Sequence, residues 1–99
     1  MTPQEVAAAA ADHIARVGLN QNGGFFADAS TLFNPPDDVS CCVLGAAAVV
    51  AYVDDRLTFH AVLGGWLQAK NPLIHGVADW SDDTPQEEVV ARLREFAAS

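Results

Sequence analysis

Two adjacent cysteines are the residues of this chain best suited to covalent chemistry. Cys41 and Cys42 follow Ser40, which has the residue type of a helix N-cap, so both thiols are expected in the first helical turn. The helix dipole lowers the pKa of a thiol at that place and favours the reactive thiolate. A nucleophilic cysteine also needs a base, and three histidines are candidates: His13, His60 and His75. The alternative is that both thiols fill the buried end of a core helix, and the absence of a catalytic signature around them favours it.

Metal ligation and carboxylate chemistry have weaker signals. The histidines stand singly along the chain, without the paired spacing of zinc ligands. Five carboxylates gather near the start of the last predicted helix: Asp79, Asp82, Asp83, Glu87 and Glu88. This segment lacks the central glycine of a calcium loop and a nearby base for phosphate, and the helix dipole stabilises acids in a first turn. No catalytic set, cofactor motif or metal ligand set is therefore predicted.

Aromatic side chains beside these acids are the candidates for binding a partner. Exposed aromatic residues flanked by charged ones are typical of protein interfaces, whereas core filling is the alternative use of the same residues. The predicted interaction residues are Trp66, Trp80, Phe25 and Phe26, together with Asp79, Asp82 and Asp83. A small-molecule pocket bounded by Trp66, Trp80 and the 19–39 segment is a second use for some of them.

Length and charge restrict the classes of function. The 99 residues suffice for one domain, and the net charge of −8 comes from 13 acidic and 5 scattered basic residues. Binding to nucleic acid needs clustered lysine and arginine, so it is not expected. Two stretches, 17–55 and 71–91, each hold five acids and no Lys or Arg, which suits solubility or a basic partner. The longest apolar run, 41–53, is 13 residues long, too short for a bilayer, and the N-terminus lacks a basic signal region; a cytoplasmic location is expected.

The hydrophobic pattern predicts helices separated by one long irregular segment. Thr2 and Glu5 can form a capping box around Pro3, and Gly18 is placed to end the first helix. The segment 19–39 contains Gly23–Gly24 and Pro35–Pro36 and should be irregular, with its aromatic residues packed back on the body and a weak hairpin signal at 22–26. Helices are expected at 41–53, 56–70 and from Thr84 onward, with a short one within 73–80 and a turn at 81–83.

The fold class predicted from these elements is all-α. Residues 1–99 should form a single-domain bundle of four main helices around a central helix at 41–53, because a segment apolar on every side is buried on every side. Gly64–Gly65 interrupts the 56–70 helix at a cost of about 2 kcal/mol relative to two alanines. The pair therefore indicates either a close backbone crossing or a bend.

Three short motifs stand out in the sequence: Asn20–Gly24, Cys42–Ala46, and Ala78–Asp82 ahead of Thr84 and the Glu88–Val90 helix. In these motifs the chain resembles a family of small uncharacterised proteins from actinobacteria and their bacteriophages. Such proteins share a Cys-x-Leu-Gly-Ala helix and a Trp-Asn-Asp-like turn before the last helix, and Ser81 departs from the usual asparagine. The resemblance implies an all-α domain without an established activity, in which Leu44–Ala46 is a packing motif and Trp80 with Asp82 organises the last turn.

These observations lead to three hypotheses of different classes. The first is a non-enzymatic domain that binds a protein partner or a second copy of itself, as an accessory protein of a phage or an actinobacterium. The second is a small-ligand binding or sequestering protein. The third is a thiol-dependent enzyme that uses Cys41 or Cys42. No cofactor, nucleic acid or membrane partner is expected in any of them.

Overall fold

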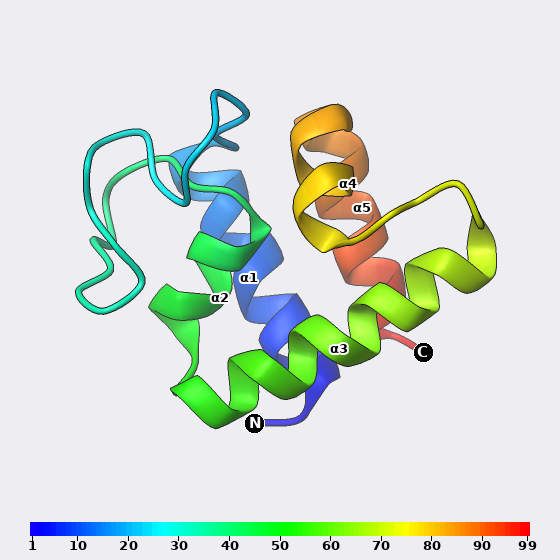
Figure 1. The fold of residues 1–99 in the computed structure, drawn as a ribbon. Coiled ribbons are helices and arrows are strands. Elements are labelled where there is room, and N and C mark those ends of the chain that lie inside the picture. The colour runs from blue at the N-terminus through cyan, green and yellow to red at the C-terminus, as the bar shows by residue number, and fades with distance from the viewer.

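Five helices and no strand make up the computed structural model, which describes all residues from 1 to 99 and confirms the all-α class. The helices are α1 (Pro3–Val17), α2 (Val43–Val50), α3 (Val53–Lys70), α4 (Val77–Asp83) and α5 (Gln86–Ala97). Helices α1 and α5 lie side by side in opposite directions, α3 crosses below them, and the segment between α1 and α2 folds over one side (Figure 1).

The start and end of α1 follow the prediction. The Thr2 hydroxyl accepts a hydrogen bond from the Glu5 backbone N–H at 3.1 Å, and the Glu5 carboxylate accepts one from the Thr2 N–H at 2.8 Å. This reciprocal capping box satisfies two N–H groups that the helix cannot pair internally. Gly18 ends the helix with a φ of 95°, a positive value that residues other than glycine rarely adopt.

The central helix is α1, and the prediction that the 41–53 segment takes this place was wrong. Helix α1 packs against α5, α2 and α3, and its side chains Val6, Ala10 and Ile14 are fully buried. Helix α2 is shorter than predicted, since it begins after Cys42 and ends before Ala51. A new helix, α3, then starts at Val53 rather than at Arg56. An uninterrupted apolar run does not show where a chain changes direction, because every residue in it suits a buried site.

The segment between α1 and α2 is irregular, as predicted, and is attached to the body through Cys41. The Cys41 N–H donates to the Gly18 carbonyl, and the Cys41 carbonyl accepts from the Asn20 N–H. Phe26 also pairs with Cys41 through an isolated β-bridge, and no hairpin forms at 22–26. The expectation that this segment packs back on the body through its aromatic residues holds for buried Phe26 and fails for Phe33, which is 99% exposed.

The C-terminal part differs from the prediction at one junction. Residues 81–83, predicted as a turn, form the last part of α4, and α5 begins at Gln86 without a side-chain cap from Thr84. Thr84 is itself buried. Gly64–Gly65 lies within the unbroken α3; a Cβ on Gly64 would be 3.8 Å from a Val77 methyl and one on Gly65 would meet nothing, so no close backbone crossing requires the pair.

Aromatic contacts close the core between α3 and α5. Phe59 and Phe96 meet edge to face with ring centroids 6.5 Å apart, and Trp66 and Phe96 do so at 5.5 Å. Such T-shaped pairs add to the free energy gained from burying the rings. The fully buried Leu63 and Leu93 lie in the same core.

Candidate interaction site

The predicted interaction residues do not form one surface. Trp80 and Phe26 are buried, with 8% and 3% of their side chains exposed, and both belong to the hydrophobic core. Trp66 is half-buried against Phe96, and the Lys70 ammonium lies 4.6 Å from its ring centroid. Only Phe25, at 39% exposure, is an accessible aromatic residue of the predicted set.

The predicted acidic residues lie together on α4. Asp79, Asp82 and Asp83 are all exposed, and the last two stand at the C-terminal end of this helix. Neither Asp82 nor Asp83 caps the last helix, because α5 begins after Pro85 and has no side-chain cap. Carboxylates at a helix C-terminus are not stabilised by the dipole, so the explanation proposed for these acids from sequence does not hold for this pair.

The two thiols precede α2 instead of lying in its first turn. Cys41 is completely buried, and Cys42 is 5% exposed and occupies the N-cap position without a side-chain cap bond. Burial raises the pKa of the Cys41 thiol to about 12 and also raises the pKa of Cys42, the opposite of the predicted lowering. No hydrogen bond joins either thiol to a histidine, and His13 interacts instead with Arg16 at 3.1 Å.

A pocket of about 330 Å³ lies between α4, α5 and the end of α3. Its lining combines carboxylates with cations and includes Trp80, Asp79, Asp83, Lys70 and Arg92. Neither Trp66 nor any residue of the 19–39 segment contributes to it. This pocket therefore differs from the one predicted from the sequence and shares only its Trp80 boundary.

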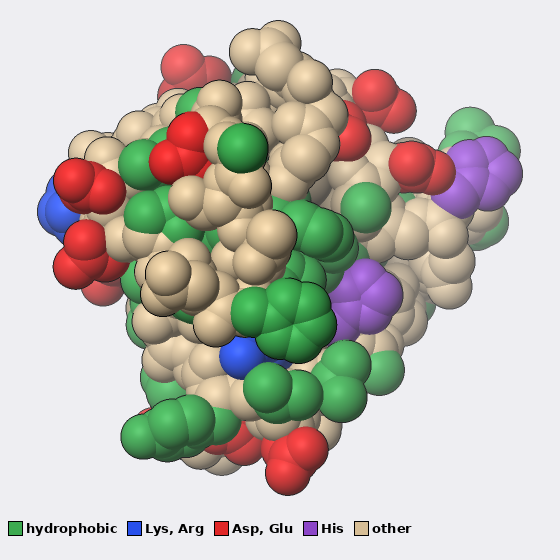
Figure 2. Space-filling model, turned by 60° about the vertical axis from the view of Figure 1, so that its left-hand side comes forward, with side chains coloured by type: hydrophobic (Ala, Val, Ile, Leu, Met, Phe, Trp, Pro, Cys, Tyr) green, Lys and Arg blue, Asp and Glu red, His purple; other side chains and the backbone are tan.

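A second, mostly apolar concave surface lies between the 32–35 segment and the junction of α2 with α3. It has a volume of about 530 Å³ and is called the apolar groove here. Nine of its twelve lining residues are hydrophobic. The twelve are Met1, Leu32, Phe33, Pro35, Ala48, Val49, Val50, Ala51, Tyr52, Val53, Asp55 and Arg56. In Figure 2, hydrophobic side chains gather on the lower half of the face shown.

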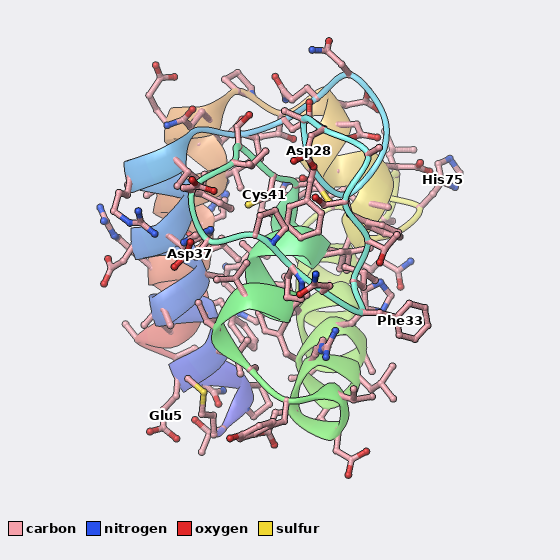
Figure 3. All side chains as sticks on the ribbon, turned by 90° about the vertical axis from the view of Figure 1, so that its left-hand side faces the viewer. Glu5, Asp28, Phe33, Asp37, Cys41 and His75 are labelled. Atoms are coloured by element: carbon pink, nitrogen blue, oxygen red, sulfur yellow. The ribbon has the colours of Figure 1, made fainter.

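Large side chains at the rim of the apolar groove are turned to solvent. Phe33 is 99% exposed and Tyr52 86% exposed, and Figure 3 shows Phe33 pointing away from the body. Val53 and Leu57, at the start of α3, are 57% and 65% exposed. Sequence reasoning missed this surface because it assigned Phe33 to packing and Tyr52 to a buried helix. The Asn34–Asp38 turn and the break between α2 and α3 place both rings outside the core.

The charged residues that line the apolar groove come from the first turn of α3. The Asp55 carboxylate forms an ion pair with the Met1 amino group at 3.1 Å. One amino nitrogen of Arg56 (Nη1) donates to the Leu32 carbonyl at 3.1 Å and thereby ties the 31–36 segment to α3. The Arg56 Nε atom is buried and has no hydrogen-bond partner.

None of the five helices combines the length and the apolar character that crossing a bilayer requires.

Comparisons with curated proteins and with solved structures find no match. The model of one protein family, described as a family of unknown function (DUF6197), matches residues 1–99. Because this match extends over the whole chain, the protein belongs to that family.

Proposed function

We propose that this protein is a non-enzymatic interaction domain that binds a protein partner through the apolar groove. The observation that carries the proposal is the exposure of Phe33 and Tyr52, at 99% and 86%, on the rim of a mostly apolar groove. Contiguous apolar surface of this kind is costly in water, and aromatic residues are enriched at the centres of protein interfaces.

The two alternative functions have less support from the geometry. A small-ligand site encloses most of its ligand, whereas Phe33 and Tyr52 project from their groove into solvent. A thiol-dependent enzyme needs an accessible thiolate, whereas both cysteines are buried and their pKa values are raised. A broad surface with projecting aromatic rings is better suited to another protein chain.

The wider role is also a proposal. Similarity of the short motifs to actinobacterial and phage proteins favours an accessory protein of such an organism, acting in the cytoplasm. Two free cysteines suit a reducing compartment. The net charge of −8 disfavours nucleic acid as the partner. A protein partner remains the class of molecule that these features fit together.

The test compares rim variants with an exposed apolar control. Phe33→Ser and Tyr52→Ser each remove an exposed ring, so the fold should be retained, and circular dichroism checks this. Leu73→Ser removes a side chain that is 81% exposed beside the other pocket. Wild type and Leu73→Ser, cross-linked in lysate of the native host, should yield the same partner, and both rim variants should lose it. If only Leu73→Ser lost the partner, the binding surface would lie at the α3–α4 end instead. If all four proteins recovered the partner equally, the proposal would be contradicted.

A further inference from the structure

We infer that the apolar groove binds a partner segment in which a carboxylate adjoins large apolar side chains, and that Arg56 pairs with this carboxylate. The inference rests on the proposed function and specifies the chemistry of the partner. Two observations carry it: the bonding of the Arg56 guanidinium, and the apolar walls on either side of it.

Arg56 is a half-buried cation without an anionic partner. Its only hydrogen bond is the one from Nη1 to the Leu32 carbonyl, and its Nε is buried and unpaired. No carboxylate lies within 4.0 Å of the guanidinium, although the chain holds 13 acidic residues. Lys70, Arg92 and Arg94 all form ion pairs with acidic side chains. Arg16, the remaining base, is exposed to water and does not share the burial of Arg56.

The nearest acid in the sequence does not neutralise this charge. The Asp55 carboxylate is engaged by the Met1 amino group. A guanidinium that loses part of its hydration without gaining a counter-ion raises the free energy of the folded protein. The Arg56 Nε is too deep for an outside carboxylate to reach, but Nη2 makes no hydrogen bond and is not among the buried unpaired atoms. A carboxylate from outside would therefore pair with the terminal nitrogens of the guanidinium, a charge-assisted contact. Arg56 is therefore an anion-binding group at the base of the groove.

The walls of the groove determine what must accompany the carboxylate. Leu32, Phe33 and Pro35 form one side, and Val50 and Tyr52 belong to the other. These side chains can bury only apolar groups without leaving polar atoms unpaired. A fitting segment therefore carries large apolar residues next to an Asp, a Glu or a chain terminus. This is recognition by apolar anchors with one charged contact, as in many peptide-binding surfaces.

A second copy of this chain is a poor occupant. Two copies would each bring a net charge of −8, and their mutual repulsion opposes association.

A matched pair of peptides tests the inference on the full-length protein. The probes are acetyl-Ser-Gly-Ser-Leu-Phe-Leu with a free C-terminal carboxylate and the same peptide with a C-terminal amide. Each is titrated into ¹⁵N-labelled protein while amide resonances and the Arg56 Nε–H resonance are followed. Resonances of residues 31–35 and 48–56 should shift with both, and the carboxylate peptide should bind at least about tenfold more tightly, as a charge-assisted pair implies.

Variants assign the preference to Arg56. Arg56→Gln retains an amide that can donate to the Leu32 carbonyl but removes the charge, so the two peptides should bind equally. Arg56→Lys should keep part of the preference for the carboxylate peptide, because it keeps the positive charge. This variant separates the effect of the charge from that of the hydrogen bond to the Leu32 carbonyl. Arg94→Gln is the control, because Arg94 pairs with Asp12 outside the groove, and the full preference should remain.

Three outcomes would overturn the inference. Equal affinity of the wild type for both peptides, with groove resonances shifting, would show that the carboxylate is not recognised and would leave the proposed function standing. Concentration-dependent shifts of the same resonances without peptide would identify a second copy as the occupant. No shift with either peptide at millimolar concentration would contradict both the inference and the groove as the interaction surface.

Discussion

Three buried side chains in this domain carry titratable groups, the Cys41 and Cys42 thiols and the His13 imidazole, and for each burial opposes the charged form. Cys41 is completely buried, and its backbone joins the 19–26 segment to the body. His13 is 6% exposed on α1. Its Nδ1 faces an Arg16 nitrogen at 3.1 Å, and its Nε2 is buried without a partner. The burial of these side chains cannot be predicted from residue type, because it depends on which segments of the chain pack against each of them.

The raised thiol pKa values predict that both cysteines react slowly in the folded state. At pH 8 a pKa of about 12 for Cys41, against an ordinary 9.0, leaves about a thousandfold less thiolate, and burial also blocks the reagent. With 5,5′-dithiobis(2-nitrobenzoate) we expect almost no reaction of native protein and two thiols per chain in urea. Rapid reaction of one native thiol, lost in Cys42→Ala or Cys41→Ala, would instead support the thiol-enzyme hypothesis.

His13 should make stability depend on pH below neutrality. Burial and the Arg16 charge lower the pKa of His13 below its ordinary 6.5. The unfolded chain then takes up a proton first, so the free energy of unfolding should decrease as pH falls below 6.5. Urea denaturation at pH 7.5 and 5.0 measures this decrease. His13→Met should make the decrease in the free energy of unfolding smaller. His60→Gln, a substitution at an exposed site, should leave the decrease unchanged.

The pH interval separates His13 from the carboxylates. Glu5, Asp28 and Glu95 also have lowered pKa values, caused by hydrogen bonds to neighbouring groups. Their ordinary values lie at 4.5 or below, so the stability that they contribute is lost only under more acidic conditions. An equal decrease in wild type and His13→Met between pH 7.5 and 5.0 would show that His13 is not responsible.

At the level of elements, the same tetrapeptide has two outcomes. Thr-Pro-Gln-Glu occurs at Thr2 and at Thr84, and only Thr2 forms the capping box. Thr2 has the extended backbone conformation of an N-cap and exchanges hydrogen bonds with Glu5. Thr84 follows α4 directly, is buried, and its carbonyl accepts a hydrogen bond from Gln21. Local residue types therefore predicted both helices, while packing determined the cap.

The junction between α2 and α3 shows why boundaries inside apolar segments are difficult to predict. The N-cap positions of both helices, Cys42 and Tyr52, lack a side-chain cap bond, so no polar residue marks either start. The Cys42 N–H donates instead to the Phe25 carbonyl, a contact 17 positions away in the chain. The exposed groove at this junction could not be predicted for the same reason, because it follows from where the helix breaks.

Two glycines in different helices should respond oppositely to alanine. A Cβ on Gly45 in α2 would overlap the Phe25 carbonyl oxygen and lie 3.0 Å from the Cys41 Cβ, so Gly45→Ala should lower the free energy of unfolding by about 2 kcal/mol or more. A Cβ on Gly65 in α3 would meet no other atom within contact distance. Gly65→Ala should therefore raise the free energy of unfolding by about 1 kcal/mol, because alanine favours the helix more than glycine does. Urea denaturation of both variants measures the difference.

The Gly45→Ala and Gly65→Ala variants also test whether Leu44–Ala46 is a packing motif. Gly45 permits α2 to lie against the backbone of the 19–39 segment, which positions Phe25 and Phe26. If Gly45→Ala were as stable as the wild type, the close approach of α2 to Phe25 would be contradicted. A loss of stability in Gly65→Ala would show instead that α3 needs flexibility at its glycine pair.

At the scale of the whole molecule, charge and apolar surface oppose each other. The radius of gyration is 11.9 Å, so a net charge of −8 is confined to a small volume. The exposed rings Phe33 and Tyr52 favour association with any apolar surface, whereas like charges on two copies repel at distances up to about 8 Å in physiological salt. We expect this balance to disfavour self-association through the apolar groove.

We therefore expect the free protein to be a monomer in 0.15 M salt. Light scattering after size exclusion should give the mass of one 10.5 kDa chain between about 10 and 200 μM, since repulsion outweighs the gain from one open groove. Raising the salt to 1 M screens the repulsion, and any dimer that then forms should be weakened by Phe33→Ser but not by Leu73→Ser. A mass of two chains at low salt would show that the groove is closed by self-association, and Arg56 would then have to find its carboxylate on the other copy.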